Sequence, residues 1–317
     1  MYENDAELKR LIHVAKLYYE ENLTQSEVAA RMKVSRPLVS KLLTRAREMG
    51  IVTITIKSPL ESNDMMAEKL MSLYGLKGAL VVPEAKNDYM TEELILTQAA
   101  RLMAELMQKA RCVGLGWGFL MEAFVKQLPE VFSGREGNER SIGDVFPLIG
   151  GATVPNSGYN PNEIVRRFAE KSGLEPHYLF APAFPLTQEE RNNFTGTGNF
   201  REFEQLWSLL DLAVLRISNY PTTPDHATAT RFGKKLTQKK AVGAILSYFY
   251  DIEGGFIKGD NDFCISISLE KLRGASNVVG ICSSNSSAES IIGALRTGTI
   301  THVILDESKA LKVIANG

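Results

Sequence analysis

The chain has 317 residues, about twice the length of a typical domain, and 44% of them are hydrophobic, which suffices for a sizeable core. Its 36 basic and 37 acidic residues give a net charge of −1, which excludes a wholly basic nucleic-acid coat and a long acidic tail. The balance hides an asymmetry: residues 1–58 hold 10 basic and 7 acidic residues, and residues 59–317 hold 26 and 30. We therefore expect a local basic surface near the N-terminus.

Three scattered cysteines, Cys112, Cys264 and Cys282, form no CxxC or similar pair. They predict small buried thiols rather than a disulfide framework or a zinc site, and we expect no metal and no cofactor. No apolar stretch reaches about 18 residues, so no membrane-spanning helix is expected. The polar, acidic start MYENDAELKR is unlike a signal peptide. We therefore expect a cytoplasmic protein with no membrane partner.

The N-terminal segment predicts two successive helices. Residues 6–21 place apolar side chains at helical spacing, with charged side chains on the opposite side. Thr24-Gln25-Ser26-Glu27 has the form of a capping box, which starts a short helix that ends near Met32. Lys33 stands in the following turn, where glycine is common, so a positive φ there would cost about 1 kcal/mol.

A third helix, at about 36–48, begins after Ser35 as the N-cap, and the alternating run IVTITIKS at 51–58 predicts a strand or hairpin. This order is the form of a winged helix-turn-helix. Residues 31–47 contain six basic side chains and no acidic one, which is typical of a helix that faces DNA. The alternative is a three-helix bundle with a merely solvated basic face. The predicted DNA-binding residues are Thr24, Gln25, Ser35, Arg36, Pro37, Ser40, Lys41, Thr44 and Arg45.

The long second segment predicts an α/β domain. Residues 59–76 read as a linker helix, with a methionine-rich apolar side suited to oligomer contacts. Short apolar runs then alternate with helical patterns, which favours a Rossmann-like, mostly parallel sheet covered on both sides. The expected domains are 1–58 and 59–317. The expected strands are 78–82, 112–116, 146–151, 212–217, 277–282 and 302–306, and the expected helices are 62–74, 91–109, 119–128, 161–172, 199–210, 235–249, 285–297 and 307–314.

Ligands of such sheets bind beyond the carboxyl ends of the strands, where loops meet helix N-termini. Three loops fit this position: GLGWG at 114–118, Gly150-Gly151 with the polar loop after it, and the serine-rich run at 283–287. Each could also be a plain strand-to-helix turn, and Arg166 could be a surface charge. The candidate effector-binding residues are Gly116, Trp117, Gly118, Gly150, Gly151, Asn162, Arg166, Ser283, Ser284, Asn285 and Ser287.

Several segments, taken in order, carry a family resemblance: LTQSEVAARMKVSRPLVSKLLTRAREMGIV, GLGWG, PLIGG with NEIVRRFAEKSG, KKAVGAILSYFYD and SSAESIIGALRTGTITHVILDESKA. Together they resemble the SorC family of bacterial regulators over nearly the whole chain. The resemblance implies an N-terminal helix-turn-helix joined to a sugar- or sugar-phosphate-binding domain built like certain sugar-phosphate isomerases. It also implies operator DNA and a small sugar effector as partners, and a homodimer or homotetramer.

Several positions that bind phosphate or sugar hydroxyls in the family are altered here, so the resemblance implies a less cationic pocket and a weaker dependence on phosphate. The altered positions are Phe119 and Leu120 after GLGWG, Ala244 for an acidic residue, Ser283, Ser284 and Ser287 in a loop that usually reads GGxxK, and Ile217-Ser218-Asn219 where GIG is common.

The sequence thus predicts a DNA-binding transcription regulator, not an enzyme, whose operator binding responds to a carbohydrate or sugar phosphate. Two alternatives stay open: an isomerase- or deaminase-like enzyme with a DNA-binding appendage, and a regulator whose second domain only oligomerises. Catalysis would need a positioned acid and base, and of the four histidines only His226 has a carboxylate neighbour, Asp225. Adjacent side chains usually point apart, so no catalytic residue is predicted.

Overall fold

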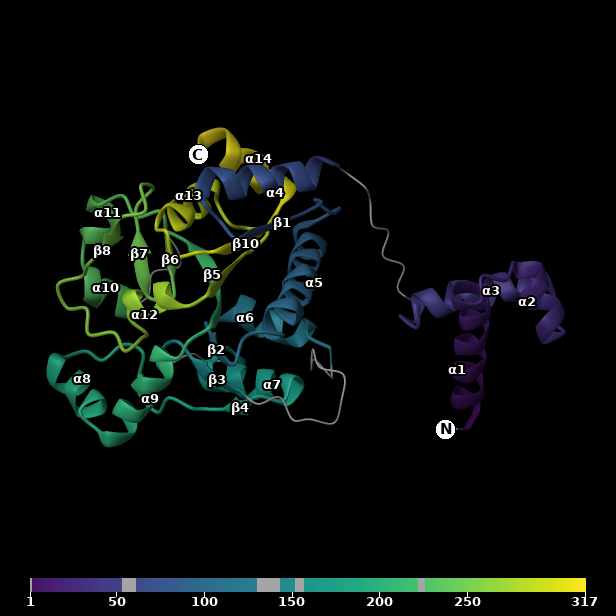
Figure 1. The fold of residues 1–317 in the computed structure, drawn as a ribbon, viewed down its shortest axis with the longest axis horizontal. Coiled ribbons are helices and arrows are strands. Elements are labelled where there is room, and N and C mark those ends of the chain that lie inside the picture. The colour runs from purple at the N-terminus through teal and green to yellow at the C-terminus, as the bar shows by residue number, and fades with distance from the viewer. Residues whose placement is uncertain (1, 53–60, 130–142, 152–156, 222–225) are drawn as a thin grey trace. The chain divides into compact units, whose positions relative to one another are not determined.

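The computed structural model describes residues 2–52, 61–129, 143–151, 157–221 and 226–317 (Figure 1). The chain divides into two compact units, Met1–Pro59 and Leu60–Gly317. Each unit has hydrophobic core of its own.

The first unit is built from helices around one small core. α1 (Tyr2–Ala15) continues as a short π-helical segment, η1 (Lys16–Glu20), and is followed by α2 (Gln25–Met32) and α3 (Arg36–Glu48). The strand or hairpin expected at 51–58 falls almost wholly on residues outside the described part of the chain. The core draws apolar side chains from each helix: Leu11, Val14, Leu17, Val28, Ala29, Val39, Leu42, Leu43 and Ala46.

Local side-chain chemistry sets both ends of α2. The Thr24 backbone N–H donates to Glu27 Oε2 at 2.7 Å, and the Glu27 N–H donates to Thr24 Oγ1 at 3.3 Å, so the expected capping box is present. Lys33 ends the helix in the left-handed conformation, with φ 54° and ψ 46°. The turn therefore has the positive φ that was expected to be unfavourable for lysine.

We expect Lys33→Gly to raise the free energy of unfolding by about 1 kcal/mol, because glycine adopts positive φ without a steric penalty from Cβ. Lys33→Ala is the matched control, since it removes the same charge but keeps Cβ. Urea-induced unfolding of the full chain measures both variants. Equal effects of the two substitutions would show that the charge of Lys33, and not its backbone conformation, sets the stability.

The second unit contains a mostly parallel sheet, which confirms the α/β prediction. Its main path has the strand order β1-β10-β9-β5-β2-β3-β4, and all neighbours in this path are parallel. Most expected strands recur with similar bounds, although the one expected at 146–151 lies at 144–147. The strands are β1 Gly78–Val82, β2 Cys112–Leu115, β3 Asp144–Pro147, β4 Glu175–Pro176, β5 Leu212–Asn219, β9 Asn277–Cys282 and β10 His302–Asp306.

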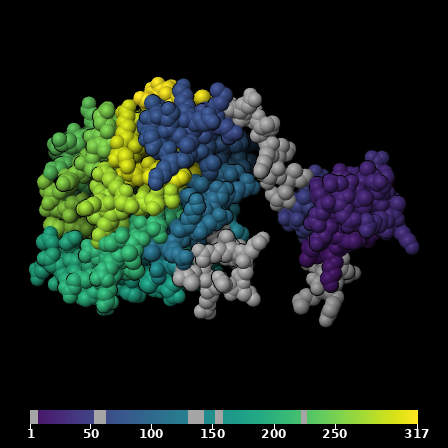
Figure 2. Space-filling model, in the orientation of Figure 1, coloured from purple at the N-terminus to yellow at the C-terminus, as the bar shows by residue number. Residues whose placement is uncertain are grey.

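Helices cover both faces of this sheet (Figure 1). One face packs against α5 (Asp88–Met107), α6 (Phe119–Gln127) and α7 (Pro161–Ser172). The other packs against α4 (Glu61–Tyr74), α9 (Gly198–Ser208), α13 (Ala288–Arg296) and α14 (Glu307–Asn316), and α4 and α14 lie side by side on the surface (Figure 2).

Strand β5 shows how side chains divide between the two faces. Leu212 and Val214 join the core beneath α5, α6 and α7, whereas Ala213 and Leu215 join the core on the opposite face. Successive side chains of a strand point to opposite faces. Arg216, near the carboxyl end of β5, therefore lies on the same side of the sheet as α5 and α6.

One expected helix is wrong. Residues 235–249 were expected to form a single helix, but they form α11 (Lys235–Gln238) and an antiparallel hairpin of β6 (Gly243–Ile245) and β7 (Tyr248–Tyr250), which β8 (Phe256–Ile257) extends. Lys240 and Leu246 both have a φ of 52°, which interrupts a right-handed helix. Pairing of β6 with the end of β5 stabilises the strand conformation. The remaining short elements are η2 (Ser157–Tyr159), α8 (Gln188–Thr195), α10 (His226–Phe232) and α12 (Leu269–Gly274).

None of the helices among the described residues combines the length and the apolar character needed to span a membrane.

Candidate functional site

Helix α3 presents a polar, basic face. Its apolar side chains Val39, Leu42, Leu43 and Ala46 are buried against α1 and α2. The predicted DNA-binding residues lie on the solvent side of α3 or at the start of α2, where Gln25 is half-buried and Thr24 is exposed. The exposed ones on and before α3 are Ser35, Arg36, Pro37, Ser40, Lys41, Thr44 and Arg45. The helix-turn-helix therefore leaves this set free to meet a partner.

The basic side chains on and near α3 differ in whether they have an ion-pair partner. Arg45 forms an ion pair with Glu7 of α1 at 3.1 Å, and Arg31 pairs with Glu21 at 2.6 Å. Within the described part of the chain, Arg36 and Lys41 have no ion-pair partner. Exposed ion pairs contribute at most about 1 kcal/mol, so the Arg45–Glu7 pair can exchange for a phosphate contact.

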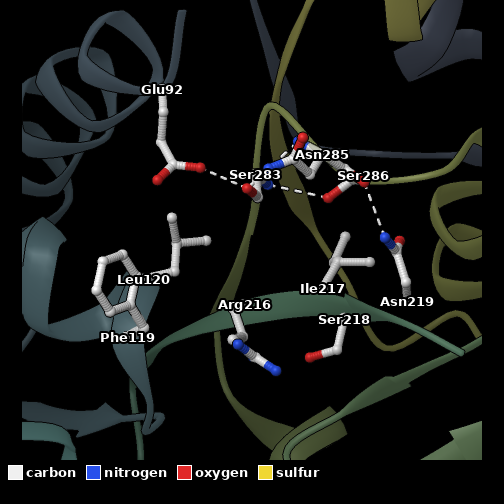
Figure 3. A pocket seen from close by; sticks show the side chains of 10 residues that line it. All are labelled: Glu92, Phe119, Leu120, Arg216, Ile217, Ser218, Asn219, Ser283, Asn285 and Ser286. Atoms are coloured by element: carbon white, nitrogen blue, oxygen red, sulfur yellow. Dashed lines mark hydrogen bonds between the residues drawn. The ribbon is translucent and has the colours of Figure 1, made fainter. Parts of the chain in front are cut away.

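A cavity of about 210 Å³ lies at the carboxyl ends of β5 and β9 (Figure 3). Its walls come from α5, the start of α6, the end of β5 and the loop between β9 and α13. The lining residues are Glu92, Phe119, Leu120, Arg216, Ile217, Ser218, Asn219, Ser283, Asn285 and Ser286. This is the edge of the sheet at which the sequence predicts a ligand site. The volume suits one small molecule rather than a dinucleotide cofactor.

Asn219, the last residue of β5, holds the serine-rich loop in place. Its Oδ1 accepts hydrogen bonds from the Ser287 backbone N–H at 2.8 Å and from the Ser290 hydroxyl at 2.9 Å. Its Nδ2 donates to the Asn285 carbonyl at 2.8 Å, the contact drawn in Figure 3. One side chain thus ties the loop and the start of α13 to the central strand.

Glu92 of α5 closes the opposite wall. Its Oε2 accepts a hydrogen bond from the Ser283 hydroxyl and lies 3.5 Å from the Ser284 hydroxyl, which also bonds to it. Inside the loop, the Ser283 N–H donates to Ser286 Oγ at 2.9 Å. The loop is therefore anchored on one side by Asn219 and on the other by Glu92.

Arg216 brings a positive charge into the wall formed by β5. Figure 3 shows Arg216 and Ser218 on one side of the strand and Ile217 on the other. No hydrogen-bond or ion-pair partner of the guanidinium occurs among the residues that the structure describes, and burial lowers the pKa of Arg216. Arginine stays charged even so, and no described residue pairs with this cation beside the cavity.

Several predicted effector-binding residues lie at or beside this cavity. Ser283 and Asn285 line it, Ser284 is buried and bonds to Glu92 of its wall, and Ser287 caps α13 by accepting from the Ser290 N–H. Gly118 is the N-cap of α6 at φ 96°, and a Cβ built there would lie 3.7 Å from Arg216 Nη1. The guanidinium is thus next to the glycine loop as well.

Gly116 and Trp117 belong to the same glycine loop and contact neighbouring segments of the fold. Gly116 N–H donates to the Val214 carbonyl at 2.8 Å, which extends the pairing of β2 with β5. Trp117 packs against Phe184, with ring centroids 6.0 Å apart. Neither residue is among those that line the cavity.

The structure does not bring the remaining predicted residues to the cavity. Gly150 is packed so closely that a Cβ there would lie 2.6 Å from the Ala181 carbonyl oxygen, and Gly151 forms a bridge to the same segment at Pro182. The side-chain amide of Asn162 forms two hydrogen bonds with the backbone of Leu179. Its Nδ2 donates to the Leu179 carbonyl at 3.1 Å, and its Oδ1 accepts from the Leu179 N–H at 3.0 Å. These residues therefore join backbone segments in this structure.

Arg166 is occupied by carboxylates of its own helix. It forms a bidentate pair with Glu163 at 2.8 Å on each side and a second ion pair with Glu170. Hydrogen bonds from Arg166 and Arg167 lower the pKa of Glu163 to about 2. The positive charge expected from Arg166 is supplied at the cavity by Arg216 instead.

Sequence reasoning missed four residues that define the cavity: Glu92, Arg216, Ser218 and Asn219. A signal was present for Arg216, because it is the one charged residue within the apolar run LAVLRI. Ser218 and Asn219 were noticed only as departures from a family pattern. Nothing local marks Glu92, one of several acidic residues on a long amphipathic helix.

Among the described residues, little supports a catalytic site or a metal site. The cavity lining contains one carboxylate and no histidine or cysteine, and no metal-binding group of three ligands occurs in the described part of the chain. Asp225 lies outside the described residues. His177 pairs with Asp144 at 2.7 Å, but at the amino end of β3, the edge of the sheet away from the cavity.

Comparison with known proteins gives matches over nearly the whole chain. The family model of a sugar-binding domain, Sugar-bind, matches residues 58–315, and that of sigma-70 region 4 matches residues 13–48. The chain is 30% identical to the sorbitol operon regulator of Klebsiella pneumoniae, with 97% of this chain and 98% of that protein covered. It is 29% identical to the deoxyribonucleoside regulator of Bacillus subtilis, with 98% and 99% covered. The crystal structure of the full-length sorbitol operon regulator aligns with a TM-score of 0.83 at 25% identity, over 97% of this chain and 98% of that one.

Proposed function

The chain belongs to the SorC family of bacterial transcriptional regulators, and we propose that it binds operator DNA through α3 and changes its affinity when a small carbohydrate occupies the cavity of its second unit. The DNA-binding part of this proposal rests on one observation: α3, which follows the capped helix α2, has an exposed basic face. A recognition helix of this kind enters the major groove, with the first of the paired helices across the backbone.

The residues of α3 have separate roles in this proposal. Arg36 and Ser40, on the solvent face at the start of the helix, contact base edges. Lys41 and Arg45 hold phosphates, together with Thr24 and Gln25 at the start of α2 and Thr44 on α3. Ser35 and Pro37 set the entry of the chain into the helix.

The cavity at β5 and β9 is the proposed effector site. Hydroxyl, amide, carboxylate and guanidinium groups all face a space sized for one small molecule, which is the mixture of donors and acceptors that a polyhydroxylated ligand requires. Two curated relatives are named as regulators of a sorbitol operon and of deoxyribonucleosides, both compounds with several hydroxyl groups. We place binding here without turnover, since no acid and base pair faces the cavity among its described lining residues.

Self-association completes the proposal. One recognition helix reads too few bases for a specific site, so helix-turn-helix proteins commonly act as dimers on paired half-sites. The adjacent helices α4 and α14 expose Met65, Leu73 and Leu311, which offer apolar surface for a second copy. We expect a dimer or tetramer by light scattering of the full chain at micromolar concentration, and a monomeric mass would contradict it.

Selection from a random duplex DNA library with the full chain tests the function. We expect enrichment of a motif with two half-sites, and loss of enrichment when residues 1–58 are removed. Anisotropy titrations of the enriched duplex, with neutral sugars, polyols, sugar acids and sugar phosphates added, then identify the effector class. Absence of any enriched motif would contradict the proposal, and turnover of an added sugar would favour the enzyme alternative.

A further inference from the structure

Arg216 differs from three other arginines of the second unit, each of which has an acceptor inside the protein. Arg231 bonds to Asp262 at 2.9 Å, Arg273 to the Thr297 carbonyl at 2.9 Å, and Arg167 to Glu163 at 2.7 Å. Arg216 has no such acceptor within the described ranges of the chain, although it lines the cavity and lies against Gly118. A guanidinium removed from water without a partner is unfavourable, and an anionic group in the cavity would supply one.

The charges of the cavity limit that anion to a single negative charge. Arg216 and Glu92 are the charged side chains among the described lining residues, and they come from β5 and α5, outside ion-pair distance of each other. Glu92 is bonded to the hydroxyls of Ser283 and Ser284. A carboxylate would be balanced by Arg216, whereas a phosphate monoester, with a charge of about −1.5 to −2 at pH 7, would leave excess negative charge near Glu92.

Most of the backbone N–H groups of the serine-rich loop already donate to acceptors inside the protein. The N–H groups of Ser283, Asn285, Ser286 and Ser287 donate to acceptors inside the protein at 2.8 to 3.4 Å. The Gly118 N–H likewise donates to the Tyr159 carbonyl at 3.4 Å. A planar carboxylate does not require such a cradle, because the guanidinium fork can bind both of its oxygens.

We propose that the effector is a small sugar acid whose carboxylate binds Arg216, while its hydroxyl groups bond to Glu92, Ser218 and Asn285. This inference rests on the proposed effector function of the cavity and specifies the chemistry of the ligand. Arg216 acts in it as the residue that determines specificity for an acid over the corresponding neutral sugar.

Titration calorimetry on the full chain tests the inference with matched ligands: tetronate, pentonate and hexonate sugar acids, the corresponding aldoses, and the corresponding aldose phosphates. We expect one of the acids to bind the unaltered chain at least about tenfold more tightly than its aldose and its phosphate. Arg216→Gln should remove that preference. Arg201→Gln is the matched control, because Arg201 lies on the exposed surface of α9 outside the cavity and should leave binding unchanged.

Two results would overturn the inference while leaving the regulator proposal intact: tighter binding of an aldose or its phosphate than of the acid, or acid binding that Arg216→Gln does not change. The preference in the unaltered chain does not depend on whether the variant folds. Operator binding without ligand, measured on the selected duplex, reports separately on the proposed function. If no compound of the panel binds while the operator does, the sugar-acid inference is overturned and DNA binding stands.

Discussion

Replacing Arg36 by alanine is expected to weaken operator binding by about 1–3 kcal/mol and to relax the sequence preference at one position of each half-site. Arg36 is the first residue of α3, it is exposed, and it has no ion-pair partner in the parts of the chain that the structure describes. An arginine at this place can bind the O6 and N7 acceptors of a guanine with both prongs of its guanidinium. Fluorescence anisotropy with the selected duplex and its single-base variants measures both effects.

Lys41→Ala is the matched comparison on the same helix. Lys41 is also exposed and, among the described residues, also without an ion pair, but we place it at a phosphate. Its loss should lower affinity for all duplexes alike and reduce the slope of log affinity against log salt by about one unit. If Arg36→Ala instead lowered affinity equally for every sequence, Arg36 would be a phosphate contact and its assignment to base reading would be wrong.

Asn219→Ala is expected to lower the free energy of unfolding by about 1–3 kcal/mol and to weaken effector binding at least tenfold. The side chain makes three hydrogen bonds of 2.8 to 2.9 Å to Ser287, Ser290 and Asn285, and alanine would leave a backbone N–H and a carbonyl without these partners. The loop between β9 and α13 would then lose its connection to β5. Urea-induced unfolding and ligand titration on the same preparation measure the two effects.

Asn316→Ala provides the control for this prediction. Asn316 is an exposed residue at the end of α14, and among the described residues its side chain bonds only to the Lys312 carbonyl of its own helix, at 2.7 Å. Its replacement should change stability by less than about 0.5 kcal/mol. Unchanged effector binding in Asn219→Ala would show that the loop keeps its shape without Asn219, and the positioning role assigned to this residue would be wrong.

The sequence predicted well wherever the deciding interactions are short in range. The capping box joins Thr24 to Glu27 three residues away, and the positive φ of Lys33 follows from a turn of fixed length between two helices. The apolar runs at 277–282 and 302–306 are strands with the expected bounds, since a strand buried on both faces needs a continuous apolar run. The error at 235–249 arises because a long-range interaction overrides the local pattern. The apolar spacing of this segment fits a helix, but it forms a hairpin because β6 pairs with the end of β5 and two of its residues have a positive φ.

The same distinction between short-range and long-range interactions applies to the site. The sequence by itself determined that a helix-turn-helix precedes an α/β domain, because caps, turns and hydrophobic periodicity depend on neighbouring residues. It also predicted a ligand site at the carboxyl ends of the strands, the edge at which the structure has a cavity. Only the tertiary structure decided which side chains gather there. Glu92, Arg216 and Asn285 lie on three segments far apart in the chain, and the order β9-β5-β2 brings them to one cavity. Asn162 and Arg166, which looked equally suitable, are held by partners on their own side of the fold. Strand order and side-chain pairing result from packing over the whole domain, and no local pattern carries them.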